Sequence, residues 1–151
     1  MSGVGGFSVA AEIEAPAPII YRIISDYREG HPRILPRPPF TALEVEQGGT
    51  GAGTVIRVGM RVLGREQSFR ATVTEPEPGR VLVETNDTGY VTTFTVEPLP
   101  SERRARVTIA TELRGRRGLL ASLEGRLAAR LLRPVYVREL ELLAEAARAS
   151  A

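Results

Sequence analysis

Six segments with strand-like patterning follow one another between residues 40 and 114, and a long segment with helical patterning comes after them. The short breaks between them hold turn residues such as glycine, proline, aspartate or serine. Breaks this short favour antiparallel neighbours, because parallel strands need a crossover connection of about a dozen residues or more. The six segments are Thr41–Gln47, Thr54–Leu63, Arg65–Glu75, Arg80–Asn86, Tyr90–Pro98 and Ala105–Arg114.

The first 40 residues predict one more strand and a short helix. Apolar residues alternate with others over Phe7–Glu14, which is the period of a strand with one buried face. Pro16 ends this pattern and suits the start of a helix, and four isoleucines then follow at helical spacing within Ala17–Tyr27. The next stretch, Tyr27–Phe40, holds several prolines and the only histidine, His31, and is expected to be a loop.

The last segment, Leu119–Ala149, predicts a long amphipathic helix. Pro134 is expected to kink it, because proline removes a backbone donor and crowds the preceding turn. A curved antiparallel sheet with one such helix can bury its concave face only by wrapping around that helix. The apolar stripe of the helix is Leu120, Leu123, Leu127 and Leu131.

Composition excludes several kinds of site. The 151 residues include no cysteine and one histidine, which excludes disulfides, thiolate nucleophiles and sites built from several histidines, and we expect no metal or cofactor. The chain has no signal-peptide pattern and no run of about 18 apolar residues, so we expect a cytoplasmic protein without integral membrane association. Its length fits one domain, residues 1–151. A formal net charge of +2 gives little reason to expect nucleic acid as a partner.

Two stretches resemble a known superfamily. Ile13–Tyr27 (IEAPAPIIYRIISDY) is a strand that leads into a helix, and Val73–Glu84 (VTEPEPGRVLVE) is a strand, a Pro-Gly turn and a strand. Together with the order of elements, they resemble the START-like superfamily, also called SRPBCC, which includes the birch pollen allergen and polyketide cyclase/dehydrase-like proteins. The resemblance implies an α+β helix-grip fold: a curved antiparallel sheet of about seven strands around a long C-terminal helix, with short helical elements between the first two strands.

The resemblance also implies a hydrophobic cavity between the concave face of the sheet and the long helix. Members of the superfamily hold lipids, sterols, polyketides or hormones there, and many have no enzymatic activity. Alternation along the strands and the helical stripe indicate which side chains face this space. The residues expected to contact a ligand are His31, Leu35, Phe40, Met60, Phe69, Tyr90, Thr92, Phe94, Thr111, Leu123, Leu127 and Tyr136. The same faces carry Ile56, Val58, Val62, Ala71, Val73, Val96, Val107, Ile109 and Leu131, which either fill the core or line the cavity.

Polar side chains among these positions matter most, because a few placed donors and acceptors orient a ligand in an apolar pocket. Tyr90 combines a large ring with a hydroxyl, and Thr92 and Thr111 are further candidates, although all three also fit ordinary packing in a sheet. Tyr136 is expected to close one end of the cavity or to pack in the core. Glu84 interrupts the apolar pattern of its strand, so we expect it on the opposite face, in solvent.

His31 raises the question of catalysis, because an imidazole titrates near neutral pH. The chain has no G-x-S-x-G motif, and a carboxylate nearby in sequence, such as Asp26, does not make a catalytic triad. Three roles stay open for His31: proton transfer, contact with a ligand, and a structural or exposed place in the loop. Leu35 and Phe40 stand where members of the superfamily often carry a tryptophan at the cavity entrance.

Three functions stay open. The first is binding or carriage of a hydrophobic small molecule such as a lipid or polyketide, and the second is a polyketide cyclase/aromatase-like enzyme in which His31 or Tyr90 transfers protons. The third is an interaction module that uses the stripe Arg126, Arg130 and Arg133. The glycine cluster Gly48–Gly53 is interpreted as a turn, because a strand follows it rather than a phosphate-binding helix. A homodimer remains possible.

Overall fold

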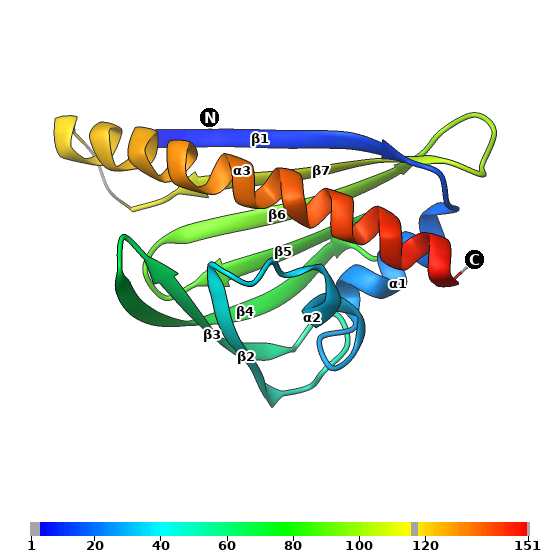
Figure 1. The fold of residues 1–151 in the computed structure, drawn as a ribbon, viewed down its shortest axis with the longest axis horizontal. Helices are drawn as coiled ribbons and strands as arrows, with labels where there is room; N and C mark the ends of the chain where they lie inside the picture. The colour runs from blue at the N-terminus through cyan, green and yellow to red at the C-terminus, as the bar shows by residue number, and fades with distance from the viewer. Residues whose placement is uncertain (1–3, 116–117, 151) are drawn as a thin grey trace.

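The computed structural model describes residues 4–115 and 118–150, so Arg116 and Arg117 of the turn expected before the long helix lie outside the described residues. Within this part of the chain, seven strands form one sheet with three helices packed against it (Figure 1). The strands are β1 (Val4–Ile13), β2 (Phe40–Gln47), β3 (Val55–Val62), β4 (Arg65–Glu77), β5 (Val81–Asn86), β6 (Tyr90–Pro98) and β7 (Ala105–Leu113). The helices are α1 (Ala17–Ser25), α2 (Gly30–Ile34) and α3 (Leu119–Ser150).

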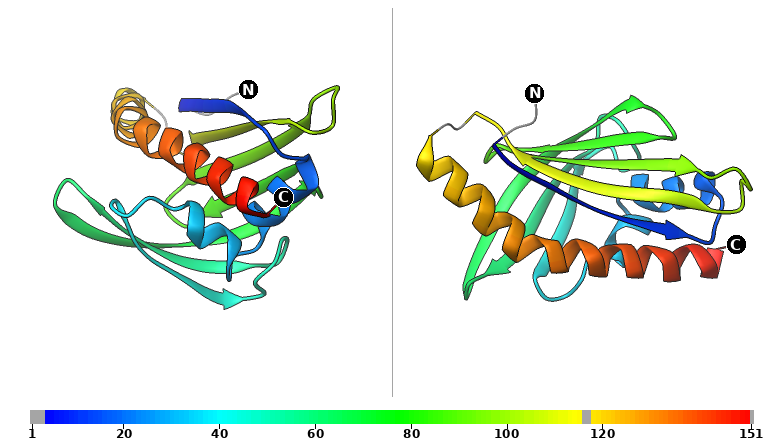
Figure 2. Two further views of the ribbon diagram at one scale, coloured as in Figure 1. Left: turned by 45° about the vertical axis from the view of Figure 1, so that its right-hand side comes forward. Right: turned by 90° about the horizontal axis from the view of Figure 1, so that it is seen from above.

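The order of strands in the sheet is β1-β7-β6-β5-β4-β3-β2, and every neighbouring pair is antiparallel. From β2 to β7 each strand pairs with the next one in sequence, as the short turns predict. The first strand pairs with the last, with Val9 opposite Ile109. The sheet curves around α3, which crosses its concave side (Figures 1 and 2). The expected helix-grip fold is therefore confirmed.

The segment between β1 and β2 holds two short helices, as the resemblance implies, although the residue pattern alone predicted a loop over Tyr27–Phe40. Helix α1 buries Ile20 and Ile24 completely in the core. Helix α2 packs closely against α1 at Gly30, where a Cβ atom would lie only 2.4 Å from the carbonyl oxygen of Ile23. Glycine therefore permits this close approach of the two helices. The contact brings the next residue, His31, under the sheet.

Helix α3 is continuous through Pro134 and bends near its middle (Figure 2, right). The expectation that its whole leucine stripe faces the sheet is wrong at the N-terminal end. Leu120 is 81% exposed and Leu123 is 50% exposed. The first turns of α3 extend past the end of β1 (Figure 1), and there the helix buries the side that carries Ala121 and Gly125, which leaves Leu120 and Leu123 toward solvent. The C-terminal half instead buries Leu140 and Leu143.

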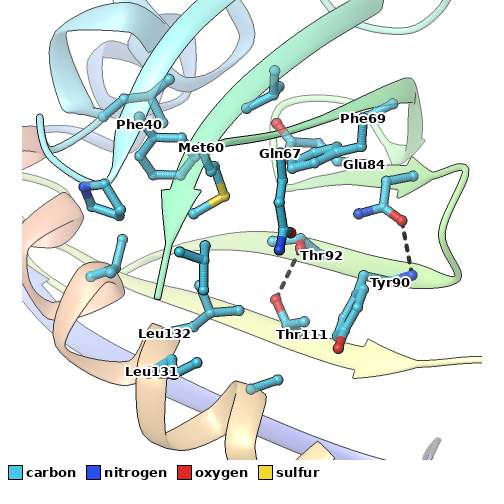
Figure 3. Close-up of a pocket in the computed structure, with 18 of the residues that line it drawn as sticks. Phe40, Met60, Gln67, Phe69, Glu84, Tyr90, Thr92, Thr111, Leu131 and Leu132 are labelled. Atoms are coloured by element: carbon cyan, nitrogen blue, oxygen red, sulfur yellow. Dashed lines mark hydrogen bonds between the residues drawn. The ribbon is translucent and has the colours of Figure 1, made fainter. Parts of the chain in front are cut away.

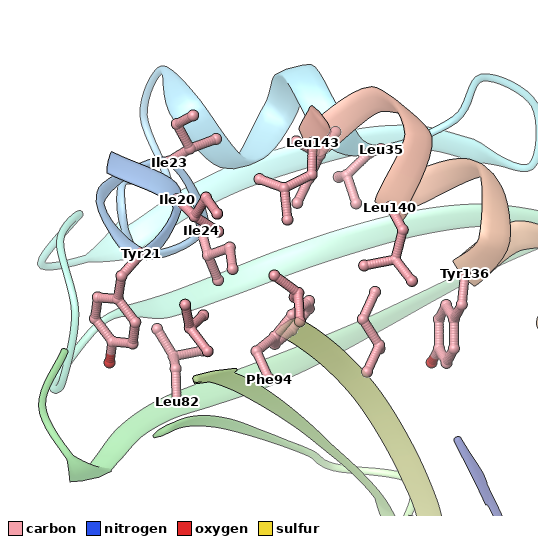
Figure 4. Packing of buried hydrophobic residues seen from close by; sticks show 14 of the residues in the cluster. Ile20, Tyr21, Ile23, Ile24, Leu35, Leu82, Phe94, Tyr136, Leu140 and Leu143 are labelled. Atoms are coloured by element: carbon pink, nitrogen blue, oxygen red, sulfur yellow. The ribbon is translucent and has the colours of Figure 1, made fainter. Parts of the chain in front are cut away.

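The hydrophobic core fills one half of the space between sheet and helices (Figure 4). It joins α1 and the C-terminal half of α3 to the middle of the sheet, with Leu82 and Phe94 among the enclosed side chains. Several residues expected on the concave faces belong to this core and not to a cavity wall: Val73, Val96, Val107 and Ile109. The other half of the space, under the N-terminal half of α3, is not filled.

Candidate functional site

A cavity of about 560 Å³ occupies the unfilled half, between the concave face of the sheet and α3 (Figure 3). Sites for small molecules typically have volumes of about 300–1,000 Å³. Aliphatic and aromatic side chains form most of its wall, including Met60 and Phe69 from the sheet and Leu131 and Leu132 from the helix. The space is large enough for a small hydrophobic molecule and has the apolar surface to bind one.

The cavity mouth lies between the β3–β4 turn and the N-terminal half of α3. Leu63, in that turn, lines the cavity and is 75% exposed, and Leu127 lines it from α3 and is half exposed. The turn has Leu63 and Gly64 at positive φ, the conformation that suits a tight two-residue hairpin. Exposed leucines on both sides give a ligand an apolar entrance.

The structure brings together nearly all of the residues that the sequence analysis placed at a ligand. Those that line the cavity are His31, Leu35, Phe40, Met60, Phe69, Tyr90, Thr92, Phe94, Thr111, Leu127 and Tyr136. Leu123 does not line it, because its side chain is half exposed on another side of α3, while the next residue, Glu124, lines the cavity.

A chain of hydroxyl groups crosses one wall of the cavity. The Thr92 and Thr111 hydroxyl oxygens lie 2.9 Å apart, and the Thr111 oxygen lies 2.7 Å from the Tyr136 hydroxyl. Burial raises the pKa of Tyr136 above its ordinary value, so this phenol stays protonated. Tyr136 also stacks on Phe7 of β1, with ring centroids 5.5 Å apart. Tyr136 thus packs in the core, as one of its two expected roles requires, and it also lines the cavity.

Tyr90 is the first residue of β6 and lines the same cavity as this chain of hydroxyls. Its hydroxyl donates a hydrogen bond to Glu124 of α3 over 2.9 Å, which joins the sheet to the helix at the cavity wall. Its backbone N–H donates to the Asn86 side chain over 3.0 Å. Tyr90 therefore contributes a ring to the wall while its hydroxyl is already engaged by a carboxylate.

His31 lies at the inner end of the cavity, and the open possibility of an exposed histidine is wrong, because only 2% of its surface is exposed. Its ring stacks on Tyr27 at 4.5 Å and meets the edge of Phe94 at 5.6 Å. Its Nδ1 lies 2.7 Å from the carbonyl oxygen of Ile24. A carbonyl oxygen can only accept a hydrogen bond, so Nδ1 carries a proton and Nε2 points toward Glu84, 3.6 Å away.

Glu84 also lines the cavity, and the expectation that it lies in solvent is wrong. Its side chain is 17% exposed, and one of its oxygens accepts a hydrogen bond of 2.5 Å from the Tyr27 hydroxyl. The concave face of β5 is the one that carries Leu82, which shares its face with Glu84 two residues later. Burial and the Glu84 carboxylate raise the pKa of Tyr27 well above its ordinary value.

The sequence analysis missed a further carboxyl group, Glu139 on α3. Glu139 lines the cavity and is 2% exposed. Burial, and then repulsion by Glu84, raise the pKa of Glu139 well above its ordinary value. A signal for this position was present, because Glu139 follows Tyr136 by three residues and precedes Leu143 by four, which places all three on one helical face.

The remaining features from the sequence analysis are the arginine stripe of the long helix, metal-binding groups and membrane spans. Arg133 donates a hydrogen bond to the Ser8 carbonyl oxygen over 3.2 Å and lies over the Phe7 ring, while Arg126 and Arg130 are exposed. Within residues 4–115 and 118–150, no group of three or more carboxylate, imidazole or thiol side chains is arranged to hold a metal ion. None of the helices in these same ranges is long and apolar enough to span a membrane.

Residues 5–148 match the family described as polyketide cyclase / dehydrase and lipid transport. The chain belongs to this family. Membership confirms the expected relation to the START-like superfamily and identifies the fold as of the type used for hydrophobic-ligand binding or polyketide cyclisation. No curated protein gives a significant match to the sequence.

Solved structures with this fold cover almost the whole chain. The KanY protein is 26% identical, with a TM-score of 0.81 over 98% of this chain and 99% of that one. The Zhui aromatase/cyclase from Streptomyces sp. R1128 is 17% identical, with a TM-score of 0.72 over 97% of this chain and 95% of that one. Ara h 8.0201 is 13% identical, with a TM-score of 0.61 over 92% and 97% of the two chains. For the Zhui aromatase/cyclase and Ara h 8.0201, the sequence identity is low enough that the likeness shows the fold alone.

Proposed function

We propose that residues 1–151 form one ligand-binding domain that takes up a single hydrophobic small molecule in the cavity between the sheet and α3. The observation that carries the proposal is the unfilled space of about 560 Å³ with a largely apolar wall. Burying the apolar surface of a ligand there is favourable, because it removes both the ligand and the wall from water. A location in the cytoplasm stays a prediction.

Binding is tested with the neutral, polarity-sensitive dye prodan. We expect a saturable increase in its fluorescence with one site per chain, and displacement of the dye by decanol. The variant Ala128→Trp places a large ring on a residue of α3 that lines the cavity, and it should weaken binding about tenfold or more. Val137→Trp adds the same ring to α3 at an exposed position outside the wall, and it serves as the control. Unsaturable fluorescence, or equal binding by both variants, would contradict the proposal.

A cyclase-like enzyme is the second candidate, and the polar inner end of the cavity favours it. There His31 Nε2 faces Glu84, and both groups can exchange protons with a ligand that reaches them. The structural likeness to an aromatase/cyclase adds only the fold to this argument. The test is turnover of linear polyketide-like thioesters by the wild type, His31→Ala and Tyr90→Phe. Loss of turnover in His31→Ala with dye binding retained would support catalysis, and unchanged turnover in both variants would exclude these two residues.

A further inference from the structure

Glu139 has a buried carboxyl group without a hydrogen-bond partner in the described part of the chain. No group in residues 4–115 or 118–150 donates a hydrogen bond to it or accepts one from it. Its pKa is raised by burial and by the charge of Glu84. Within the same residues, every fully enclosed side-chain nitrogen or oxygen has a partner. The Glu139 oxygens therefore border the open space of the cavity, whose wall includes this residue. A buried polar group in such a position lacks an interaction that a ligand can supply.

The titratable groups around Glu139 come from three elements and one connection. Glu84 faces it from β5, His31 lies beside Glu84 on α2, and Tyr27 between α1 and α2 donates to Glu84. Tyr136 is on the same helix, and burial keeps its hydroxyl protonated. Among the described residues, His31 is the basic side chain at this end of the cavity.

The His31 imidazole lies beside Glu84 and not beside Glu139. His31 Nδ1 donates to the Ile24 carbonyl oxygen, and its Nε2 lies 3.6 Å from a Glu84 oxygen, so both ring nitrogens are placed against groups other than Glu139. Glu139 is therefore left without a positive partner. Among the described residues, the other basic group on the wall is Arg61, which is exposed and lies 3.9 Å from Glu66.

We propose that the cavity prefers an apolar ligand with one protonated amine, and that the ammonium group binds at the inner end against Glu139, with Glu84 behind it. This inference rests on the proposed function. The ammonium group has three donors, and the inner end offers the carboxyl oxygens of Glu139 and Glu84 beside the aromatic side chains of Phe94 and Tyr136. On binding, Glu139 releases its proton and becomes the counter-ion, so the amine supplies the charge that the free protein lacks there.

Calorimetric titration with decylamine, decanol and decanoate near neutral pH tests the proposal. The three compounds have straight hydrocarbon chains with the same number of carbon atoms, and they differ in the charge of the head group. Decylamine should bind about tenfold tighter than decanol or more, because a charge-assisted hydrogen bond replaces a neutral one, and decanoate should bind more weakly than decanol. Binding of decylamine should release a proton, which is seen as a difference in heat between phosphate and Tris buffers.

The matched variants are Glu139→Gln and Glu141→Gln. Glutamine at 139 keeps the size of the side chain but cannot become an anion, so the preference for decylamine and the proton release should both disappear. Glu141 is exposed on the same helix, and its variant should bind like the wild type. If Glu139→Gln fails to fold, Glu139→Leu replaces it. Equal binding of decylamine and decanol would overturn this inference and leave the proposed function intact, whereas no binding of either would overturn both.

Discussion

The Tyr27 hydroxyl lies 2.5 Å from a carboxylate oxygen of Glu84, which joins the connection between α1 and α2 to the concave face of β5. Tyr27 is completely buried, and its ring also supports that of His31. One contact between residues 57 positions apart thus fixes the inner end of the cavity. It also supplies a hydrogen bond to a carboxylate that burial would otherwise penalise.

Removing this hydroxyl should destabilise the protein. Tyr27→Phe keeps the ring but leaves Glu84 without its donor, so we expect a loss of about 1–3 kcal/mol in the free energy of unfolding by urea. Tyr21→Phe is the matched comparison, because Tyr21 donates to Glu75 in a partly buried position, and we expect a loss of about 1 kcal/mol or less. Equal losses for the two variants would contradict the role assigned to Tyr27.

The buried Glu139 should make stability depend on pH. Its pKa is about 4.5 in the unfolded chain and raised in the folded protein, so the folded state binds the proton more tightly. Stability from this group is complete below the unfolded pKa and is lost as pH rises through the folded pKa. Glu139→Gln removes the dependence. The variant should therefore gain thermal stability relative to the wild type between pH 5 and pH 8, measured by calorimetry, and a constant difference would show that Glu139 does not titrate in this way.

The two ends of α3 should respond differently to the same substitution. Leu143 is completely buried beside α1, so Leu143→Ala should cost about 2–5 kcal/mol in the free energy of unfolding. The Leu120 side chain is exposed to solvent, so Leu120→Ala should change stability by about 0.5 kcal/mol or less. Denaturant titrations of both variants give the comparison. A large loss at Leu120 would mean that the N-terminal turns are covered in solution.

The contact between α1 and α2 should not tolerate a methyl group. In Gly30→Ala the new Cβ would meet the backbone of Ile23, which cannot turn aside, so we expect a loss of about 1–3 kcal/mol and weaker prodan binding as His31 shifts. In Gly59→Ala the nearest atom, at 2.7 Å, is the Thr41 hydroxyl oxygen, whose side chain can rotate. Gly59→Ala is therefore expected to lose less stability, and the reverse order would refute this account of the packing.

Much of the fold was predictable because the patterns in the sequence are local. Strand alternation, turn residues and the spacing of leucines are set by neighbours a few residues apart, and they predicted all seven strands and the start of α3 at Leu119. The resemblance implied short helical elements here, but the residue pattern did not predict α2, because α2 depends on the absence of a side chain at Gly30 against a helix elsewhere in the chain. Such a contact leaves no periodic signal.

The cavity wall was predicted better than its polar end. Alternation correctly placed Met60, Thr92 and Thr111, since apolar and polar neighbours mark the two faces of their strands. Glu84 and Glu139 were missed because a charged residue on a concave face contradicts the usual pattern of burial. Only the three-dimensional arrangement shows that the Tyr27 hydroxyl donates to Glu84 and that Glu139 borders the open space of the cavity.

Carbon-13 labelling of the methionine methyl groups tests the central claim most directly. The chain has two methionines, and Met60 lies in the cavity wall while Met1 is outside the described residues. The Met60 signal, assigned with Met60→Leu, should shift and saturate as decanol is added, and Ala128→Trp should suppress the shift. A Met60 signal that stays unchanged while decanol reaches its solubility limit would contradict binding in this cavity.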